Sequence, residues 1–418
     1  MVEPPTFIAD ACLGADPAFA FFDGTHRVHS PEMMMERAQE VFWEVGITRV
    51  SDVTDLDRIG IPVAQAVRPM ACALSVSQGK GRTIESALVG AAMEGIEKHR
   101  AETARPDLCQ ASPRDVASDH AIVDVSCLVS SELPPDIFEA LPMRWSKGFD
   151  LFTGADVFVP FDLVTMDFSR KADSEAFVRS SNGLGSGGTF AEAALSALLE
   201  VVERDAMADF SALPQRERHM RRVGPDTIEH LSASDLYDKV LRADVDIEVW
   251  DVTNDIGLPT YHVRLRDKPH TDMHDLLPNC VGSGCHLSPS IALSRAITEA
   301  AQTRVTVISG TREDLVRQSQ SSTRHRDMTS TLLSGLFEQK LPPGPSRPNL
   351  AAATALIDLQ TVAQALASAR ISEVAIVDLS LPDHGVFVVR AIVPGVGQLL
   401  PRHRFRTGRR HLEKDEFL

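Results

Sequence analysis

Three glycine-rich segments recur along the chain, each followed by small and apolar residues, and they constrain the fold more than any other feature. The segments read GKGRTIESALVGAAMEGIEK, GSGGTFAEAALSALLEVVER and GSGCHLSPSIALSRAITEAAQT. Each predicts a glycine-rich loop, then an N-cap hydroxyl and a helix. The N-caps are expected at Thr83, Thr189 and Ser288, and the helices at about 83–103, 189–212 and 289–308. Eleven and fourteen residues after each N-cap comes a polar pair: Glu94 and Glu97, Glu200 and Glu203, and Glu299 and Gln302.

The carboxylates of the second helix predict a magnesium site. Residues three apart share a helix face, so each pair presents two oxygen ligands side by side. At about 100° per residue, Glu192, Glu200 and Glu203 fall within about 80° of one another. Clustered carboxylates repel unless a cation lies between them, and Mg²⁺ takes oxygen ligands that it commonly shares with phosphate.

Arginines beside these carboxylates extend the prediction to a nucleotide. Arg295, Glu299 and Gln302 lie within about 60° on the third helix, and Arg204 directly follows Glu203. A guanidinium group suits bidentate contact with phosphate. The resulting hypothesis is a Mg²⁺–nucleotide site. Its alternative is that each polar pair lies on an exposed helix face and forms surface ion pairs.

The better-known nucleotide motifs do not fit. GLGSGG at 183–188 matches the dinucleotide-binding pattern, but the acidic residue expected after a second strand is missing, since Glu203 still lies in the first helix. QGKGRT at 78–83 is no P-loop, because Leu74 stands where its first glycine belongs. Lys80 either reaches a phosphate or is a solvated loop lysine. The histidines interpreted as structural rather than catalytic are His99 and His286.

Composition and charge exclude several classes of protein. A formal net charge of −16 argues against nucleic acid as a partner, because phosphate binding needs a basic surface. No apolar run is long enough to span a membrane, and the N-terminus MVEPPTFIADACLGADP lacks the pattern of a secretion signal. The six scattered cysteines are typical of reduced thiols. We therefore expect a cytoplasmic protein that binds neither nucleic acid nor a membrane.

Strand-like and helix-like segments are mixed along the chain, which predicts an α+β fold of layered sheets and helices. Further helices are expected at 30–47, with Ser30 as N-cap, and at 357–370. The expected strands are IPVAQAVRP, ACALSVSQ, DVFVPFDLVTMDF, AFVRSSNG, DIEVWDVT, LPTYHVRLRD, EVAIVDLS and GVFVVRAIV.

Together the three segments resemble the YcaO family. The resemblance rests on SQGKG followed by Glu94 and Glu97, on SNGLGSGGT with LLEVVERDA, and on GCHLSPSIALSRAITEAAQTR, and it extends from about residue 61 to IVPG at 392–395. It implies a YcaO-type fold with an ATP site, neither P-loop nor Rossmann, built from three glycine-loop and helix repeats. It also implies an enzyme that uses ATP to phosphorylate a peptide backbone amide oxygen, after which a nucleophile displaces the phosphate. The expected organisation is an N-terminal arm and helical subdomain at 1–60, an ATP-binding catalytic domain at 61–397 with a proline-rich connector at 340–349, and a basic irregular tail at 398–418.

The resemblance also implies a role for each matching residue. The implied Mg²⁺ ligands are Glu94, Glu97, Glu192, Glu200 and Glu203. The implied ATP-binding residues are Lys80, Asn182, Arg204, Arg295, Glu299 and Gln302. Those expected to act on the transferring phosphoryl group are Glu203, Arg204 and Arg295.

Two positions depart from the family's pattern. Gly188 stands where asparagine is common, and Lys98 follows Glu97 where arginine is common. The first departure weakens a nucleotide contact or shifts it to Ser186 or water. The second keeps the charge but loses bidentate geometry. Neither removes a magnesium ligand.

The stretch GITRVSDVTDLDRIGIPVAQAVRP at 46–69 resembles the branch that works with a TfuA partner and forms thioamides from an external sulfur source. Azoline-forming members usually end in a proline-rich tail, whereas this chain ends GRRHLEKDEFL. The resemblance therefore favours thioamidation of a substrate peptide or protein, with a TfuA-like partner and a sulfur donor. The alternatives are azoline-forming cyclodehydration at Cys, Ser or Thr of a precursor peptide, another amide-activating reaction such as amidine formation, and a non-catalytic nucleotide-binding scaffold. The chain could also act as a homodimer.

Overall fold

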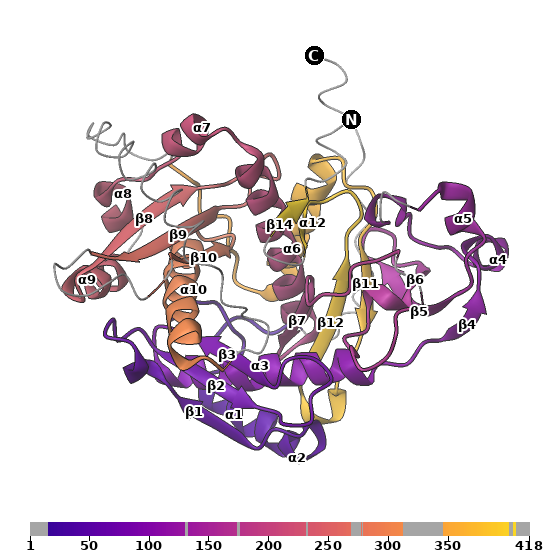
Figure 1. Ribbon diagram of the computed structural model, residues 1–418, viewed down its shortest axis with the longest axis horizontal. Coiled ribbons are helices and arrows are strands. Elements are labelled where there is room, and N and C mark those ends of the chain that lie inside the picture. The colour runs from indigo at the N-terminus through magenta and orange to yellow at the C-terminus, as the bar shows by residue number, and fades with distance from the viewer. Residues whose placement is uncertain are drawn as a thin grey trace.

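The computed structural model describes residues 16–129, 133–173, 176–230, 233–268, 277, 279–311, 346–400 and 404–406. The α+β class is confirmed: helices cover three antiparallel sheets, and β13 and β14 form a separate two-stranded sheet (Figure 1). The helices are α1 (Pro31–Glu40), α2 (Phe42–Val45), α3 (Ile84–Thr103), α4 (Pro113–Asp119), α5 (Pro135–Glu139), α6 (Phe190–Ala212), α7 (Gln215–Met220), α8 (Pro225–His230), α9 (Ser234–Arg242), α10 (Pro289–Ser309) and α12 (Ala355–Ser368). The strands are β1 (Arg49–Asp52), β2 (Val63–Val67), β3 (Val76–Lys80), β4 (Leu108–Ala111), β5 (Met143–Asp150), β6 (Asp156–Pro160), β7 (Leu184–Gly187), β8 (Val245–Asp251), β9 (Thr260–Asp267), β10 (Cys280–Cys285), β11 (Ala375–Asp378), β12 (Phe387–Ile392), β13 (Gln398–Leu400) and β14 (Arg404–Arg406). Short 3₁₀ turns are η1 (Thr54–Leu56), η2 (Ser126–Leu128), η3 (Phe161–Leu163) and η4 (Pro382–His384).

The largest sheet has the strand order β4-β5-β11-β12-β7, with β6 also paired to β5, and helices pack on both of its faces. Alternate residues of β12 enter two different apolar clusters, as the period-two geometry of a strand requires. Val389 and Ala391 join the cluster of α6 and α12, whereas Val388 and Ile392 join the cluster of α1 and α3. The smaller sheets have the orders β1-β2-β3 and β10-β9-β8, and α10 packs on the second of them. None of the helices in the described ranges is long and apolar enough to cross a bilayer.

The glycine-rich stretch before each of the three helices belongs mainly to a strand rather than to a loop, which corrects the expectation from sequence. β3, β7 and β10 are each an edge strand of their sheet, and each leads into the helix of its repeat. The glycines are needed because the helix lies directly on the strand. A Cβ atom on Gly185 would lie 2.5 Å from the Ala197 nitrogen and 2.7 Å from the Ala193 oxygen. Gly79, Gly282 and Gly284 also meet the backbone of their own helices at such distances.

All three predicted residues lie at the N-caps of their helices, but only two of them form a side-chain cap. Thr83 and Thr189 accept hydrogen bonds from the third backbone N–H of their helices. Ser288 makes no side-chain cap; instead its own N–H donates to Nδ1 of His286 at 3.0 Å, and Pro289 begins α10. The helix expected at 30–47 begins at the predicted Ser30 cap but breaks at Val41 into α1 and α2.

Other sequence expectations differ from the structure in detail. AFVRSSNG at 176–183 forms no strand; the strand β7 follows it. The tail expected to be irregular contains the β13–β14 hairpin. Residues 340–345 of the proline-rich connector lie outside the described residues, and 346–350 form neither helix nor strand. The elements that the sequence reading missed are β1, β4, β5, α4, α5, α7, α8 and α9.

Close strand–helix contact gives a testable contrast between two glycines. We expect Gly185→Ala to lower the free energy of unfolding by about 3 kcal/mol or more, because the new Cβ meets rigid backbone atoms. Gly90, inside α3, has only ordinary contacts, the nearest at 3.5 Å, so Gly90→Ala should raise it by about 0.5–1 kcal/mol. Urea unfolding of both variants tests this pair. Equal stabilities would contradict the strand–helix packing described here.

Candidate functional site

The three repeats contact one another in a closed ring at the centre of the molecule, where α3, α6 and α10 approach (Figure 1). In each contact a polar residue of one repeat's strand binds a carboxylate on another repeat's helix. The pairs are Ser186 of β7 with Glu97 of α3, Ser283 of β10 with Glu203 of α6 at 2.9 Å, and Lys80 of β3 with Glu299 of α10. The ring therefore fixes one acidic residue of each helix relative to the next repeat.

Arg204 of α6 lies among the acidic residues of this ring. Its guanidinium is 3.5 Å from Glu200 and 3.6 Å from Glu203. Burial alone would lower the pKa of Arg204, but Glu203, Glu200 and Glu299 outweigh burial and raise it. Burial would likewise raise the pKa of Glu299, yet Lys80, Arg204 and Arg295 lower it. These residues, far apart in sequence, form one electrostatic unit.

Two carboxyl groups of the site resist ionisation. Burial raises the pKa of Glu97 to about 8; the charges of Glu94 and Glu200 add to this effect, while the hydrogen bond from Ser186 opposes it. Burial also raises the pKa of Glu200 to about 6, with Arg204 opposing. Carboxyl groups held with raised pKa values in one place are suited to a divalent cation, which would stabilise their ionised forms.

Glu94 and Glu192 already have partners within the protein. Glu94 pairs with Lys98 at 2.8 Å and accepts a hydrogen bond from the backbone N–H of Gln78 at 2.6 Å. The two oxygens of Glu192, which is only 2% exposed, accept the backbone N–H groups of Val28 and Gly188 at 2.8 Å each. Each carboxylate oxygen keeps a second lone pair, so both groups remain candidates for magnesium.

The N-terminal segment explains the departure at Gly188. A Cβ atom there would lie 2.6 Å from the His29 ring and 3.0 Å from the Met34 sulfur. The space that an asparagine side chain would need is therefore taken by residues that precede and begin α1. The same segment brings in Arg27, whose electrostatic partners include Glu192 and Glu97 and which the sequence reading missed.

Several buried polar atoms around the ring have no hydrogen-bond partner among the described residues. Arg295 Nε and Asn182 Oδ1 belong to predicted site residues. Gln78 Nε2 and Arg390 Nη1 belong to residues that the sequence reading did not select. Buried polar groups normally have partners, so unpaired ones beside an acidic cluster indicate a polar ligand. Gln302 lies half-buried one turn beyond Glu299.

The described residues contain no group of three or more His, Cys, Asp or Glu side chains close enough to hold a metal ion by themselves. Mg²⁺ does not need such a cage, because it is commonly bound by one or two carboxylates together with phosphate oxygens and water. The donor set fits this mode: Glu97, Glu200 and Glu203 are carboxylates on neighbouring helices, and Arg204 and Arg295 provide positive charge for phosphate. ATP with Mg²⁺ is therefore compatible with the residues present.

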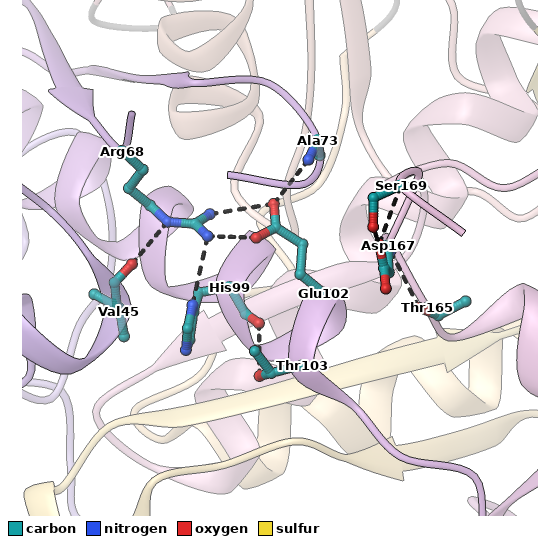
Figure 2. A network of polar contacts seen from close by, with 9 residues as sticks. All are labelled: Val45, Arg68, Ala73, His99, Glu102, Thr103, Thr165, Asp167 and Ser169. Atoms are coloured by element: carbon teal, nitrogen blue, oxygen red, sulfur yellow. Dashed lines mark hydrogen bonds and ion pairs between the residues drawn. The ribbon is translucent and has the colours of Figure 1, made fainter. Parts of the chain in front are cut away.

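The two histidines interpreted as structural have structural partners. Figure 2 shows His99 beside Arg68, whose guanidinium also contacts Glu102 and the Val45 carbonyl. Glu102 in turn accepts the backbone N–H of Ala73 at 3.1 Å. His286 is 4% exposed and accepts the N–H of Ser288, and burial holds its pKa well below the usual value.

A family model described as YcaO cyclodehydratase, ATP- and Mg²⁺-binding, matches residues 78–397. The α+β fold is thus that of a family of ATP-dependent peptide-modifying enzymes, and the chain belongs to this family, the YcaO family. A protein from the tfuA 3′ region of Rhizobium leguminosarum bv. trifolii is 36% identical over 358 residues, which cover 84% of each chain. An uncharacterized protein of Methanothermobacter thermautotrophicus is 33% identical over 388 residues, covering 88% of this chain and 93% of its own.

Solved structures share the fold at lower identity. A heterocyclase in complex with substrate and cofactor superposes with a TM-score of 0.72 at 20% identity, over 98% of this chain and 56% of its own length. YcaO from Methanopyrus kandleri, bound with AMPPCP and Mg²⁺, superposes with a TM-score of 0.67 at 23% identity, over 91% of this chain and 94% of its own. These likenesses confirm the YcaO-type fold.

The raised pKa values give a pH prediction. A carboxylate must be ionised to bind a metal, so Mg²⁺–ATP binding at pH 7 should release a proton, chiefly from Glu97. Apparent affinity should rise about tenfold per pH unit between pH 6 and 8 if one proton is released. In the metal-free protein the folded state holds this proton and the unfolded state does not, so stability should fall as pH rises from about 5 to 8. Calorimetry in two buffers of different ionisation enthalpy measures the release; equal affinities at pH 6 and 8 would contradict it.

Proposed function

We propose that the protein uses ATP and Mg²⁺ to phosphorylate a backbone amide oxygen of a peptide or protein, and that sulfur then replaces this oxygen to give a thioamide. The observation that carries the proposal is the ring of inter-repeat contacts, which holds carboxylates and arginines of three helices at one place. The family's description as ATP- and Mg²⁺-binding supports the cofactors, and the Rhizobium relative supports an association with a TfuA-like partner.

In this proposal the acidic residues of the chain would hold the metal ion and the basic residues would bind phosphate. Bound Mg²⁺ with ATP would neutralise charge at the transferring phosphoryl group. Glu97, Glu200 and Glu203 are the first candidates to hold the ion, and Glu94 and Glu192 are further ones. Arg204 and Arg295 would bind phosphate oxygens and stabilise charge on the phosphoryl group as it moves. The residues proposed to hold the rest of the nucleotide are Lys80, Glu299 and Gln302.

The nearby thiol supports an external sulfur donor. Cys285 has Glu203 and Arg295 among its electrostatic partners, but it is only 1% exposed and burial raises its pKa to about 12. A thiol is nucleophilic as the thiolate, so Cys285 is unsuited to carry sulfur at neutral pH. We propose that a partner such as a TfuA-like protein delivers sulfur to a catalytic unit comprising residues 61–397, with 1–60 and 398–418 as flanking parts.

To test the proposal, substrate peptides are first captured with the ATP-loaded protein. The protein and the captured peptides are then incubated with Mg²⁺–ATP, sulfide and a TfuA-like protein. Peptide-stimulated, magnesium-dependent ADP formation is expected, with a peptide mass increased by the exchange of oxygen for sulfur. Loss of water instead would support the alternative, an azoline-forming cyclodehydratase, which the family's description favours. Nucleotide binding without any ADP formation would leave only the non-catalytic scaffold.

A further inference from the structure

A buried arginine outside the three repeat helices has one unsatisfied donor. Arg390 of β12 is 3% exposed. Its Nε donates to the Leu163 carbonyl at 2.9 Å and its Nη2 to the Ser180 carbonyl at 2.7 Å. Nη1 is buried without a partner in the described part of the chain, and Glu200 is the carboxylate that acts on the charge of Arg390. A buried cation with a free donor is costly, so the site is built to receive an acceptor.

An unsatisfied acceptor lies on the turn that Arg390 holds. Residues 181–184 form a turn, with the Leu184 N–H donating to the Ser181 carbonyl at 3.0 Å and Gly183 at a φ of +77°. The backbone N–H of Ala391 donates to the Gly183 carbonyl at 2.7 Å. Together with the bond from Arg390 to the Ser180 carbonyl, this contact binds β12 to the chain on both sides of Asn182. Asn182 Oδ1 is buried without a partner, whereas its neighbour Ser181 is exposed.

The pair of unsatisfied groups selects the chemistry of the ligand. Nη1 of Arg390 needs an acceptor and Oδ1 of Asn182 needs a donor. Phosphate oxygens are acceptors only and would leave Asn182 unpaired. A peptide unit offers one C=O and one N–H, which satisfies both. An adenine edge also offers a donor and an acceptor. However, Arg390 interacts electrostatically with Glu200, a carboxylate of the proposed phosphate end of the site, which argues against adenine as the group bound here.

We propose that Arg390 and Asn182 bind a backbone amide of the substrate polypeptide, which assigns Asn182 to the peptide rather than to ATP. This inference rests on the proposed amide-activating function. The bound amide is the one next to the reacting amide, because a donor on the reacting oxygen would oppose its attack on phosphorus. Recognition through the backbone places the chain without requiring a particular side chain, and the exposed Ser181 marks the side from which the polypeptide enters.

The probe is an acetylated and amidated hexa-alanine peptide, labelled with ¹³C and ¹⁵N at its central amide and titrated with the full-length protein. Chemical-shift changes of that amide measure its binding, with and without Mg²⁺ and a non-hydrolysable ATP analogue. We expect binding to the wild type, weakened at least about tenfold in Asn182→Ala and in Arg390→Lys. Ser181→Ala, one residue away on the same turn, is the matched control and should bind normally.

Calorimetric titration with the ATP analogue separates this inference from the proposed function. Nucleotide affinity should change less than about twofold in Asn182→Ala, since the residue is assigned to the peptide. Thermal unfolding checks that Arg390→Lys remains folded, and Asn182→Ala keeps the test informative if it does not. Absence of peptide binding by wild type that still binds nucleotide, or a loss of nucleotide affinity in Asn182→Ala, overturns the inference. Failure of the wild type to bind nucleotide instead overturns the proposed function.

Discussion

Glu203→Gln should reduce magnesium-dependent ATP turnover at least about 100-fold while the protein stays folded. Glu203 is 3% exposed and accepts the Ser283 hydroxyl at 2.9 Å, and the Arg204 guanidinium lies 3.6 Å from it. Glutamine has the same shape and can still accept from Ser283 through its carbonyl oxygen. The substitution therefore keeps the repeat contact but removes the negative charge that Mg²⁺ requires of a ligand.

The measurement is steady-state ADP formation over a range of Mg²⁺ concentrations, with thermal unfolding recorded in parallel. Glu200→Gln should give the same loss. Glu85→Gln is the matched control, because Glu85 is exposed in the first turn of α3 and takes no part in the ring. Wild-type turnover in both Glu200→Gln and Glu203→Gln would refute the magnesium assignment. Loss of the folded state in Glu203→Gln would instead indicate that its role is structural.

The repeat could be predicted from sequence because its signals are local. Glycines, small helix residues and the spacing of eleven and fourteen residues all lie within one segment, and they gave the positions of Glu200 and Glu203. The spacing did not show that the segments are edge strands, because the glycine requirement arises from a helix backbone packed onto the strand. Glycine is required both where a backbone packs too closely for a Cβ atom and in many turns, so the sequence alone does not distinguish the two.

Residues that enter the site singly could not be found in the same way. Arg27 lies in a segment without periodicity, and Arg390 lies in a strand that otherwise reads as apolar. Arg27 lies near the ring in a segment whose Val28 N–H donates to Glu192, 164 residues away. Ser288 lies at the predicted N-cap but forms no side-chain cap; its N–H donates to Nδ1 of His286, and Pro289 begins the helix.

The ring accounts for how carboxylates can be buried on helices that otherwise resemble core. An isolated buried carboxylate costs far more than an apolar side chain gains. Here each helix places one acidic group against a hydroxyl or ammonium donor from a neighbouring repeat's strand, and arginines of α6 and α10 lie beside them. The carboxylates on the helix faces are thus the same groups that form the contacts between repeats. Loosening one repeat should therefore disturb the site as a whole.

The second large effect concerns stability rather than activity. Asp57, just after η1, binds Arg304 of α10 through two hydrogen bonds of 2.9 and 3.1 Å. Arg304 is fully buried and Asp57 is 8% exposed, and Asp267 of β9 lies 3.1 Å from the same guanidinium. Removing one partner of a buried ion pair typically costs about 3–5 kcal/mol. We expect Asp57→Asn to lower the free energy of unfolding by about 3 kcal/mol, at the low end because Asp267 still neutralises Arg304.

Urea unfolding of Asp57→Asn measures this cost, and Asp55→Asn provides the control. Asp55 lies two residues earlier in the same turn but is exposed, so its substitution should change the free energy of unfolding by no more than about 0.5 kcal/mol. A double variant, Asp57→Asn with Asp267→Asn, should lose more than the two single losses combined, because Arg304 would then have neither carboxylate. Equal stabilities of Asp57→Asn and Asp55→Asn would show that the segment at 46–69 is not anchored to α10 by this pair.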